Sequence, residues 1–412
     1  MKGLKSDMWW ITGICILLIA GVIVFQWIQH GVNDHRGKNP YDLITTFKGD
    51  GQTSRAFTWF TNDPDAEGIV QIAQGTEANV LEDPSSLITT YQVTSSVIKN
   101  SDGKNKAVHK AEVTGLQSGS TYVYRVGSGK QEEWSEAYTL TTEKDNEDHF
   151  TFINVTDSQG VTEADFGLWG KTLEQAFAIF PEAKFIVHNG DLTEEPENEE
   201  AWSFFVNKAK GRLAQIPLMP VTGNHDEVDK NADVYAGHFN LPINGDEESI
   251  SGTNYSFDYG HVHFVFLNTE SNIKGQLGWL KNDLESSNQQ WTIVAMHRPA
   301  YGGNTYDKVE KWVKVLDEYD VDLVLQGHNH EYSRSYPLRD GVIVNDGEGT
   351  IYVTTNTAGQ KFNDKKEDQF YHAVHFQNYK QMFAGITVNG NKLVYEAYDV
   401  DGEKLDEFLL KK

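Results

Sequence analysis

Hydrophobic and polar residues alternate in short runs between residues 41 and 142. The runs Arg55–Phe60, Ile69–Ile72, Ala107–Val113 and Thr121–Val126 follow this alternation, and polar turns separate them. An alternation with a period of two buries one face of a strand and leaves the other face in solvent. Short strands at this spacing are typical of a β-sandwich, so residues 41–142 are predicted to form a small all-β domain.

The pattern changes after the charged linker of residues 143–148. Apolar runs such as His149–Val155 and Lys184–His188 now alternate with segments that have helical spacing. Strands that alternate with helices are typical of a layered α/β or α+β domain, which we predict for residues 148–412. Helices are predicted with Trp169, Leu173, Phe177 and Phe180 on one face, over Glu199–Leu213, near Gln276–Glu285, and with Val309, Trp312, Val313 and Leu316 on one face.

A long apolar run lies near the amino terminus. Residues 9–28 contain no charged side chain and would span about 30 Å as a helix, which is the thickness of the bilayer core. A cleaved signal peptide is the alternative, but Phe25-Gln26-Trp27-Ile28 lacks the small residues that cleavage requires. We therefore expect a single-pass membrane anchor, a cytoplasmic head of residues 1–8, a tether of residues 29–40, and an extracytoplasmic location for the folded domains at the cell surface.

Composition narrows the possible chemistry. The 412 residues include 35 Lys and Arg against 60 Asp and Glu, a net charge of −25 that disfavours nucleic acid as a partner. The single cysteine, Cys15, lies inside the apolar run and excludes a disulfide scaffold or a thiolate zinc site. Any metal site must therefore use oxygen and imidazole ligands.

Five polar motifs stand at or just past the ends of apolar strands. Ligand sites in α/β sheets lie beyond the carboxyl ends of strands, so these loops are expected to converge on one site. Aspartate can bridge two cations, and neutral imidazole and amide groups complete a ligand set suited to Zn²⁺, Mn²⁺ or Fe. Polar turn residues are the simpler interpretation, but histidine is not a common turn residue. The motifs are Val155-Thr156-Asp157-Ser158-Gln159-Gly160, Asn189-Gly190-Asp191, Gly223-Asn224-His225-Asp226, Val294-Ala295-Met296-His297 and Gly327-His328-Asn329-His330.

This ordered set of motifs resembles the calcineurin-like metallophosphoesterase superfamily. The stretch Ala111–Leu116 followed by Thr121–Val126 resembles the end of a fibronectin type III-like domain. With such a domain in front, the chain is most similar to the purple acid phosphatase group. The resemblance implies a β-sandwich core flanked by helices, preceded by a small all-β sandwich, and two divalent metal ions as cofactors.

The resemblance also implies a role for each motif residue. Asp191 would bridge both metal ions, and Asp226 would orient His225 beside the substrate phosphate. Arg298 is a candidate for lining the substrate pocket, together with Asn224 and His225. The remaining metal ligands would be Asn224, His297 and His328 at the second metal, and Asp157 and His330 at the first.

Two positions depart from the family pattern. Purple acid phosphatases carry a tyrosine, coloured by iron(III), where this chain has Glu194. The wider superfamily often has a histidine where this chain has Gln159. Glu194 and Gln159 are therefore candidate replacement ligands at the first metal, and we expect no purple colour and a loosely held, exchangeable ion such as Mn²⁺ or Fe²⁺.

The predicted activity is that of an acid phosphatase-like hydrolase. Two cations about 3.5–4 Å apart lower the pKa of a bound water towards roughly 7, and the resulting hydroxide attacks a small phosphomonoester. A phosphodiesterase acting on nucleotides or glycerophosphodiesters, and a surface binding protein with a degenerate site, remain alternatives. The sequence gives no indication of the oligomeric state. His372 and His375 lie outside the motifs and are more typical of packing or surface positions.

Overall fold

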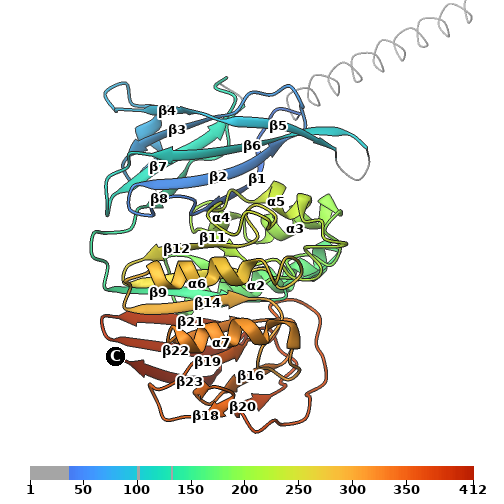
Figure 1. Ribbon diagram of the computed structural model, residues 1–412. Coiled ribbons are helices and arrows are strands. Elements are labelled where there is room, and N and C mark those ends of the chain that lie inside the picture. The colour runs from blue at the N-terminus through green and yellow to red at the C-terminus, as the bar shows by residue number, and fades with distance from the viewer. Residues whose placement is uncertain (1–36, 100–102, 131–132) are drawn as a thin grey trace, which may run out of the picture.

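A computed structural model describes residues 37–99, 103–130 and 133–412 (Figure 1). The predicted head of residues 1–8, the predicted anchor of residues 9–28 and most of the predicted tether lie outside these residues. In the described part of the chain, no helix combines the length and the apolar character needed to cross a bilayer.

The N-terminal domain is the predicted small β-sandwich, built from two antiparallel four-stranded sheets. Alternate side chains of β2, β3 and β7, such as Trp59, Ile72 and Tyr124, fill the core between the sheets. The first sheet has the order β1 (Tyr41–Thr46), β2 (Ser54–Thr61), β6 (Asn105–Thr114) and β5 (Thr94–Lys99). The second has the order β4 (Thr89–Gln92), β3 (Ile69–Gln74), β7 (Thr121–Gly127) and β8 (Tyr138–Thr141), with a short 3₁₀ helix η1 (Ala78–Leu81).

The second domain is the predicted layered fold, and two mixed sheets form its centre. One sheet has the order β11 (Leu218–Pro220), β10 (Ile186–His188), β9 (His149–Val155), β21 (Met382–Asn389), β22 (Lys392–Asp399) and β23 (Lys404–Lys411). The other has the order β12 (Tyr255–Tyr259), β13 (Val262–Leu267), β14 (Trp291–Met296), β15 (Leu323–Gln326), β19 (Ile351–Thr354), β16 (Tyr332–Ser335) and β20 (His372–Phe376). A small hairpin pairs β17 (Leu338–Arg339) with β18 (Val342–Ile343).

Alternation along the central strands creates two cores. Phe264 and Phe266 of β13 point toward the first sheet and join the core between the sheets. Val265 and Leu267 of the same strand point the opposite way, into a second core beneath α6 and α7. Because strands of this kind bury both faces, the runs that form them are continuously apolar.

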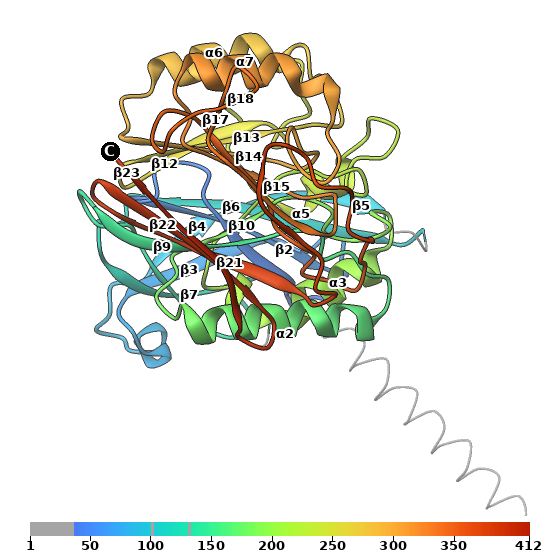
Figure 2. The same ribbon diagram turned by 90° about the horizontal axis from the view of Figure 1, so that it is seen from below.

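Helices cover both outer faces of the two sheets (Figure 2). α6 (Gln276–Ser286) and α7 (Glu310–Glu318) lie on one side, and α2 (Glu163–Ile179) lies on the other, where Trp169 stacks on Phe205 of α3 (Glu199–Lys208). The predicted continuous helix over Glu199–Leu213 is wrong. Ala209, with φ −108° and ψ 8°, leaves the helical region and separates α3 from α4 (Lys210–Leu213). The shorter elements are α5 (Asp233–His238) and η2 (Asp307–Val309).

The two domains share a packed interface. The ring of Phe47, at the end of β1, enters the core of the second domain and contacts Phe185 and Phe257. Asn240 joins the domains through hydrogen bonds, because its amide donates to the carbonyl of Ala111 and its own carbonyl accepts from the Thr46 hydroxyl. The β-sandwich therefore packs directly against the second domain through both apolar and hydrogen-bonded contacts.

Candidate metal centre

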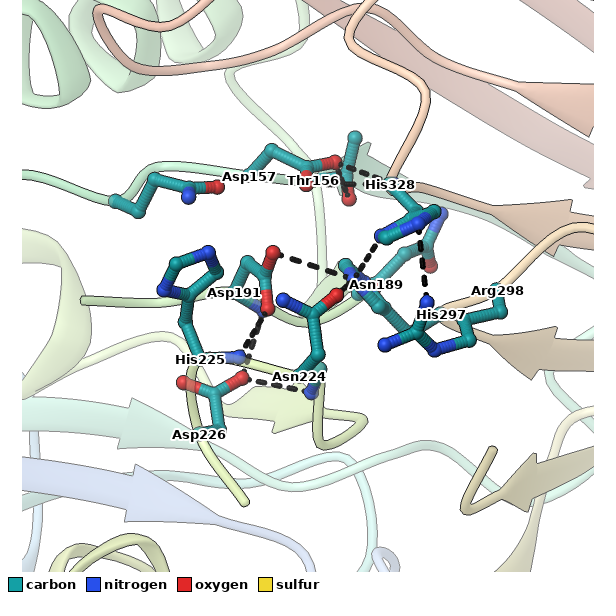
Figure 3. A network of polar contacts seen from close by, with 12 residues as sticks. Thr156, Asp157, Asn189, Asp191, Asn224, His225, Asp226, His297, Arg298 and His328 are labelled. Carbon is teal, nitrogen blue, oxygen red and sulfur yellow. Dashed lines mark hydrogen bonds and ion pairs between the residues drawn. The ribbon is translucent and has the colours of Figure 1, made fainter. Parts of the chain in front are cut away.

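Parallel pairing brings the motif loops to one edge of the two sheets. β9, β10 and β11 run parallel in one sheet, and β13, β14 and β15 run parallel in the other. The loops after β9, β10, β11, β14 and β15 therefore leave the sheets on the same side, as the sequence predicts. Figure 3 shows Asp157, Asp191, Asn224, His297 and His328 turned toward a common space.

Asp191 lies between two groups of potential ligands. With His297 and His328 it forms one group, and with Asp157 and His330 it forms the other. Within each group, one ligand atom per residue lies within 4.8 Å of the others. Nε2 of His297 is 3.3 Å from Oδ2 of Asp191, and Nε2 of His330 is 3.0 Å from Oδ1 of Asp157. One carboxylate is thus shared by two candidate cation positions.

Asn224 adds an amide oxygen to the group of His297 and His328. Its Oδ1 lies 3.3 Å from Nε2 of His297, which in turn lies 3.2 Å from Nδ1 of His328. These atoms are potential metal donors, and they meet on the side of Asp191 that faces the second sheet. This second half of the centre therefore brings together four side chains with carboxylate, amide and imidazole donors.

Backbone carbonyls fix the orientation of two imidazole rings. Nδ1 of His297 lies 2.8 Å from the carbonyl of Asn189, and Nδ1 of His330 lies 2.9 Å from the carbonyl of Lys361. A carbonyl only accepts, so each Nδ1 carries a proton and donates it. When these rings are neutral, the lone pair is on Nε2, the nitrogen that faces the carboxylates. Hydrogen bonds of this kind are characteristic of metal-binding histidines.

The motif loops adopt an unusual backbone conformation. Asp157, Asp191, His328 and His330 have positive φ angles of 53°, 55°, 71° and 52°. This left-handed region is costly for residues that have a Cβ atom, and such residues cluster at functional sites. Gly223 permits the close approach of two loops, since a Cβ on it would lie 2.2 Å from Oδ1 of Asp191.

The buried carboxylates of the centre carry negative charge that favours the binding of cations. Asp157, Asp191 and His297 are almost completely inaccessible to solvent. Burial raises the pKa of the Asp157 carboxyl, but the neighbouring charge of His330 outweighs burial and holds that pKa well below its usual range. Burial lowers the pKa of His297, and the charge of Asp191 reverses this and raises it. The carboxylates thus attract positive charge, which divalent metal ions would supply without protonation of the imidazoles, and the donor set fits Zn²⁺, Mn²⁺ or Fe.

Asp226 has a different place from the one that the sequence suggested. Its carboxylate accepts hydrogen bonds from the backbone N–H groups of Asp191, Leu192 and Gly223, at 2.7, 3.0 and 2.8 Å. The Asp226 carboxylate therefore joins the loop that carries Asp191 to its own loop. The imidazole of His225 is instead held by the carbonyl of Glu194, 2.9 Å from Nδ1.

Gln159 and Glu194 pair with each other. Nε2 of Gln159 donates to Oε2 of Glu194 at 2.9 Å, and Nζ of Lys361 lies 3.1 Å from Oε1 of the same carboxylate. Oε1 of Gln159 is buried and has no hydrogen-bond donor within the described residues. The Glu194 carboxylate does not belong to either of the two ligand groups around Asp191. Lys361 lies in no recognisable motif, so the sequence did not reveal this ion pair.

Arg298 lies at the second half of the centre. Nη1 is 3.2 Å from Nε2 of His328, and Nε donates to both carboxylate oxygens of Glu270 at 2.9 and 3.0 Å. The guanidinium also lies over the ring of Tyr306, 5.1 Å from its centroid. Arg298 is thus held beside the metal ligands, and its partner Glu270, just beyond the apolar strand β13, carried no signal in the sequence.

Comparison with known proteins agrees with this geometry. Residues 150–332 match the family described as calcineurin-like phosphoesterase, and residues 40–142 match the purple acid phosphatase N-terminal domain. The chain carries a calcineurin-like phosphoesterase domain. It follows a purple acid phosphatase N-terminal domain, as the resemblance of the motifs implied.

Relatives of the chain include proteins that are named as phosphatases. The chain is 26% identical over 294 residues to acid phosphatase type 7 of Mus musculus, a match that covers 61% of this chain and 64% of that protein. It is 24% identical over 299 residues to purple acid phosphatase 15 of Arabidopsis thaliana, with 62% and 54% covered. These matches span less than two thirds of the relatives' lengths.

The fold also matches a solved structure. A purple acid phosphatase isolated from seeds of yellow lupin (Lupinus luteus) superposes with a TM-score of 0.75 and 16% sequence identity. The superposition covers 91% of this chain and 74% of the lupin chain. At this identity the similarity establishes the shared architecture of the β-sandwich and the phosphoesterase domain.

Proposed function

We propose that the chain hydrolyses small phosphomonoesters at a centre that holds two divalent metal ions. One observation carries this proposal: the carboxylate of Asp191 belongs to two ligand groups at once. The names of the mouse and Arabidopsis relatives support a phosphatase activity. The first ion would be held by Asp157, Asp191 and His330, and the second by Asp191, Asn224, His297 and His328.

Two bound metal ions would activate water for attack on phosphorus and offset the charge of the phosphate. His225 is the candidate proton donor to the departing alcohol. Its backbone N–H donates to Oδ1 of Asp191 at 2.8 Å, and its Nδ1 donates to the carbonyl of Glu194. The side chain keeps 27% of its surface exposed, so Nε2 of the protonated ring is the atom that would deliver the proton.

Arg298 is the candidate for substrate binding at the opposite side of the centre. Its guanidinium is planar and suited to bidentate contacts with phosphate oxygens. Glu270 holds the Nε edge, while Nη1 points toward His328. Arg298 would therefore bind a phosphate oxygen close to the second ion and orient the ester, together with the amide of Asn224.

Metal-dependent hydrolysis tests this proposal directly. The full chain is stripped with a chelator, reloaded with Mn²⁺, Zn²⁺ or Fe²⁺, and assayed with a phosphomonoester and a phosphodiester. We expect hydrolysis of the monoester that returns only with metal. A preference for the diester would assign a phosphodiesterase instead, and the absence of hydrolysis with every metal would favour a binding protein with a degenerate centre.

We also propose that residues 9–28 anchor the chain in a membrane, with the phosphoesterase domain on the extracytoplasmic side. The support is the uncharged apolar run and the tryptophans at its two ends. Carbonate extraction of membranes should leave the chain in the pellet, and protease added to intact cells should cleave it. Release into the carbonate supernatant would contradict the anchor.

A further inference from the structure

A second cluster of imidazole and carboxylate groups lies on β20 and the segment just before it, outside the proposed catalytic centre. Asp368, His372 and His375 each place one ligand atom within 4.8 Å of the others. The proposed hydrolysis uses none of these three side chains. Sequence alone favoured packing or surface roles for the two histidines, so the cluster emerges only from the fold.

A β-bulge brings the two histidines together. Residues three apart on a regular strand point to opposite faces of the sheet. On β20, Val374 pairs with Arg334 of β16, but the next pair joins His372 to Ser335, so Ala373 is passed over. The bulge places both rings on one side, with their centroids 4.0 Å apart.

The two rings differ in the hydrogen bonds that their Nε2 atoms make. Nε2 of His372 lies 3.1 Å from the carbonyl of Gly302, which only accepts, so this nitrogen is protonated. Nε2 of His375 lies 3.2 Å from Oε2 of Glu331, a completely buried carboxylate, but this nitrogen makes no hydrogen bond within the described residues. A neutral His372 ring therefore carries its lone pair on Nδ1, which accepts from the N–H of Gln369 at 3.1 Å.

The carboxylate of Asp368 faces Nδ1 of His375. Its Oδ1 lies 2.8 Å from Nδ1 of His375, a distance at which two acceptors repel unless a proton or a cation lies between them. Nζ of Lys365 lies 2.5 Å from the same oxygen and is 35% exposed, so it can turn away into solvent. The Asp368 side chain is 70% exposed, which gives an ion access from solution.

We propose that Asp368, His372 and His375 bind a divalent transition-metal ion, for which Zn²⁺ is the best chemical match. Two imidazoles and one carboxylate are ordinary zinc ligands, and solvent can take the fourth position. The buried carboxylate of Glu331 would hold the far edge of the His375 ring, as carboxylates do behind metal-bound histidines. Binding would displace Lys365 and the hydrogen bond from Gln369.

The ion would brace a loop that borders the catalytic centre. Gly302 accepts hydrogen bonds from His372 and from the Tyr371 hydroxyl, at 3.1 and 2.7 Å. The same loop connects Arg298 to Tyr306, the ring on which the guanidinium lies. Fixing His372 with a metal ion would therefore restrict the segment that holds Arg298.

Metal stoichiometry tests the inference in the full chain. We expect three Zn²⁺ ions per wild-type chain by elemental analysis and two per Asp368→Asn chain, a variant that removes an exposed ligand. Glu367→Gln, which removes the neighbouring charge outside the cluster, should keep three. His372→Asn is the second ligand variant, and Co²⁺ loading should show an absorption band that both ligand variants lose.

A catalytic variant separates this inference from the proposed function. Asp191→Asn should lose the two catalytic ions and retain one ion, and adding Asp368→Asn should remove that ion as well. This result would stand even if the wild-type chain hydrolyses no phosphoester. Equal ion counts in wild type and Asp368→Asn would overturn the inference and leave His375 as a hydrogen-bond partner of Asp368 without a metal ion.

Discussion

The two halves of the metal centre differ in the ligands that surround them. The second half joins Asp191 to an amide and two imidazoles, whereas the first half offers Asp157, Asp191 and His330. The side chains that stand where further first-metal ligands are expected, Gln159 and Glu194, are hydrogen-bonded to each other. We therefore propose that the first metal position has fewer protein ligands than the second.

We attribute this difference in ligand supply to Lys361, a positively charged residue on a neighbouring loop. Lys361 neutralises Glu194 through its ammonium group, while its backbone carbonyl orients His330. Lys361 thus orients His330, a proposed ligand of the first ion, and also pairs with Glu194, another candidate ligand of that ion. Affinity for a metal depends on ligand number and charge, so we expect the first ion to exchange faster than the second.

Substitution of Asp191, the carboxylate shared by both halves of the centre, should abolish metal binding at both positions. In Asp191→Asn, both positions lose a negative charge, so we expect both catalytic ions to be lost and kcat to fall by on the order of 10³-fold or more. Elemental analysis and steady-state kinetics measure these effects. Retention of both ions would contradict a shared carboxylate. Asp364→Asn, which changes an exposed carboxylate outside both ligand groups, serves as the control.

Removal of the His225 imidazole should leave the metal content of both halves of the centre unchanged. Since His225 contacts Asp191 through its backbone N–H, His225→Ala leaves that contact in place. We expect kcat to fall about 10²-fold because a proton donor is missing, with unchanged ion counts. The loss should be smaller for an ester with an acidic alcohol, such as a nitrophenyl phosphate. Unchanged turnover would remove His225 from the mechanism.

Release of Glu194 from its ion pair with Lys361 should reduce the difference in metal affinity between the two halves of the centre. Lys361→Met removes the ammonium group but keeps the carbonyl that holds His330, so the Glu194 carboxylate becomes free to reach the first ion. We expect about tenfold tighter binding of that ion, measured by competition with a chelator. Lys366→Met is the matched control. Weaker binding in Lys361→Met would show that the lysine supports the site in another way.

His263 provides a reference for an imidazole between carboxylates without a proposed metal. Nδ1 and Nε2 lie 2.7 and 2.9 Å from the carboxylates of Asp258 and Asp283. Burial lowers the pKa of His263, but these hydrogen bonds outweigh burial and raise it from 6.5 to about 9. Its contribution to folding stability is therefore complete below pH 6.5 and is lost as the pH rises to about 9.

The expected contribution of His263 is the smallest of these effects, roughly 2 kcal/mol. Urea unfolding at pH 6 and pH 9.5 should show a smaller loss of stability for His263→Gln than for the wild-type chain. The exposed residue His149 provides a control, and His149→Gln should retain the wild-type dependence on pH. Equal pH dependence in the two variants would contradict the raised pKa.

Much of the architecture follows from local patterns in the sequence. Alternation predicted the strands of the β-sandwich, and apolar runs predicted β9, β10 and β13 at nearly their observed bounds. The break at Ala209 was missed because both helical segments continue the same apolar spacing. Similarly, the sequence showed Asp226 beside His225 but did not show that its carboxylate would accept three backbone N–H groups from two loops.

The sequence by itself determined which donors this protein has and that they follow strands. A side chain's chemical type and its place after an apolar run are local properties, so Asp157, Asp191 and His297 were visible as candidates. The resemblance of the motifs already implied a shared Asp191, but only the tertiary structure decided that Lys361 neutralises Glu194 and that a bulge joins His372 to His375. These contacts join segments from different strands and loops, and their distances depend on sheet pairing and loop conformation rather than on residue order.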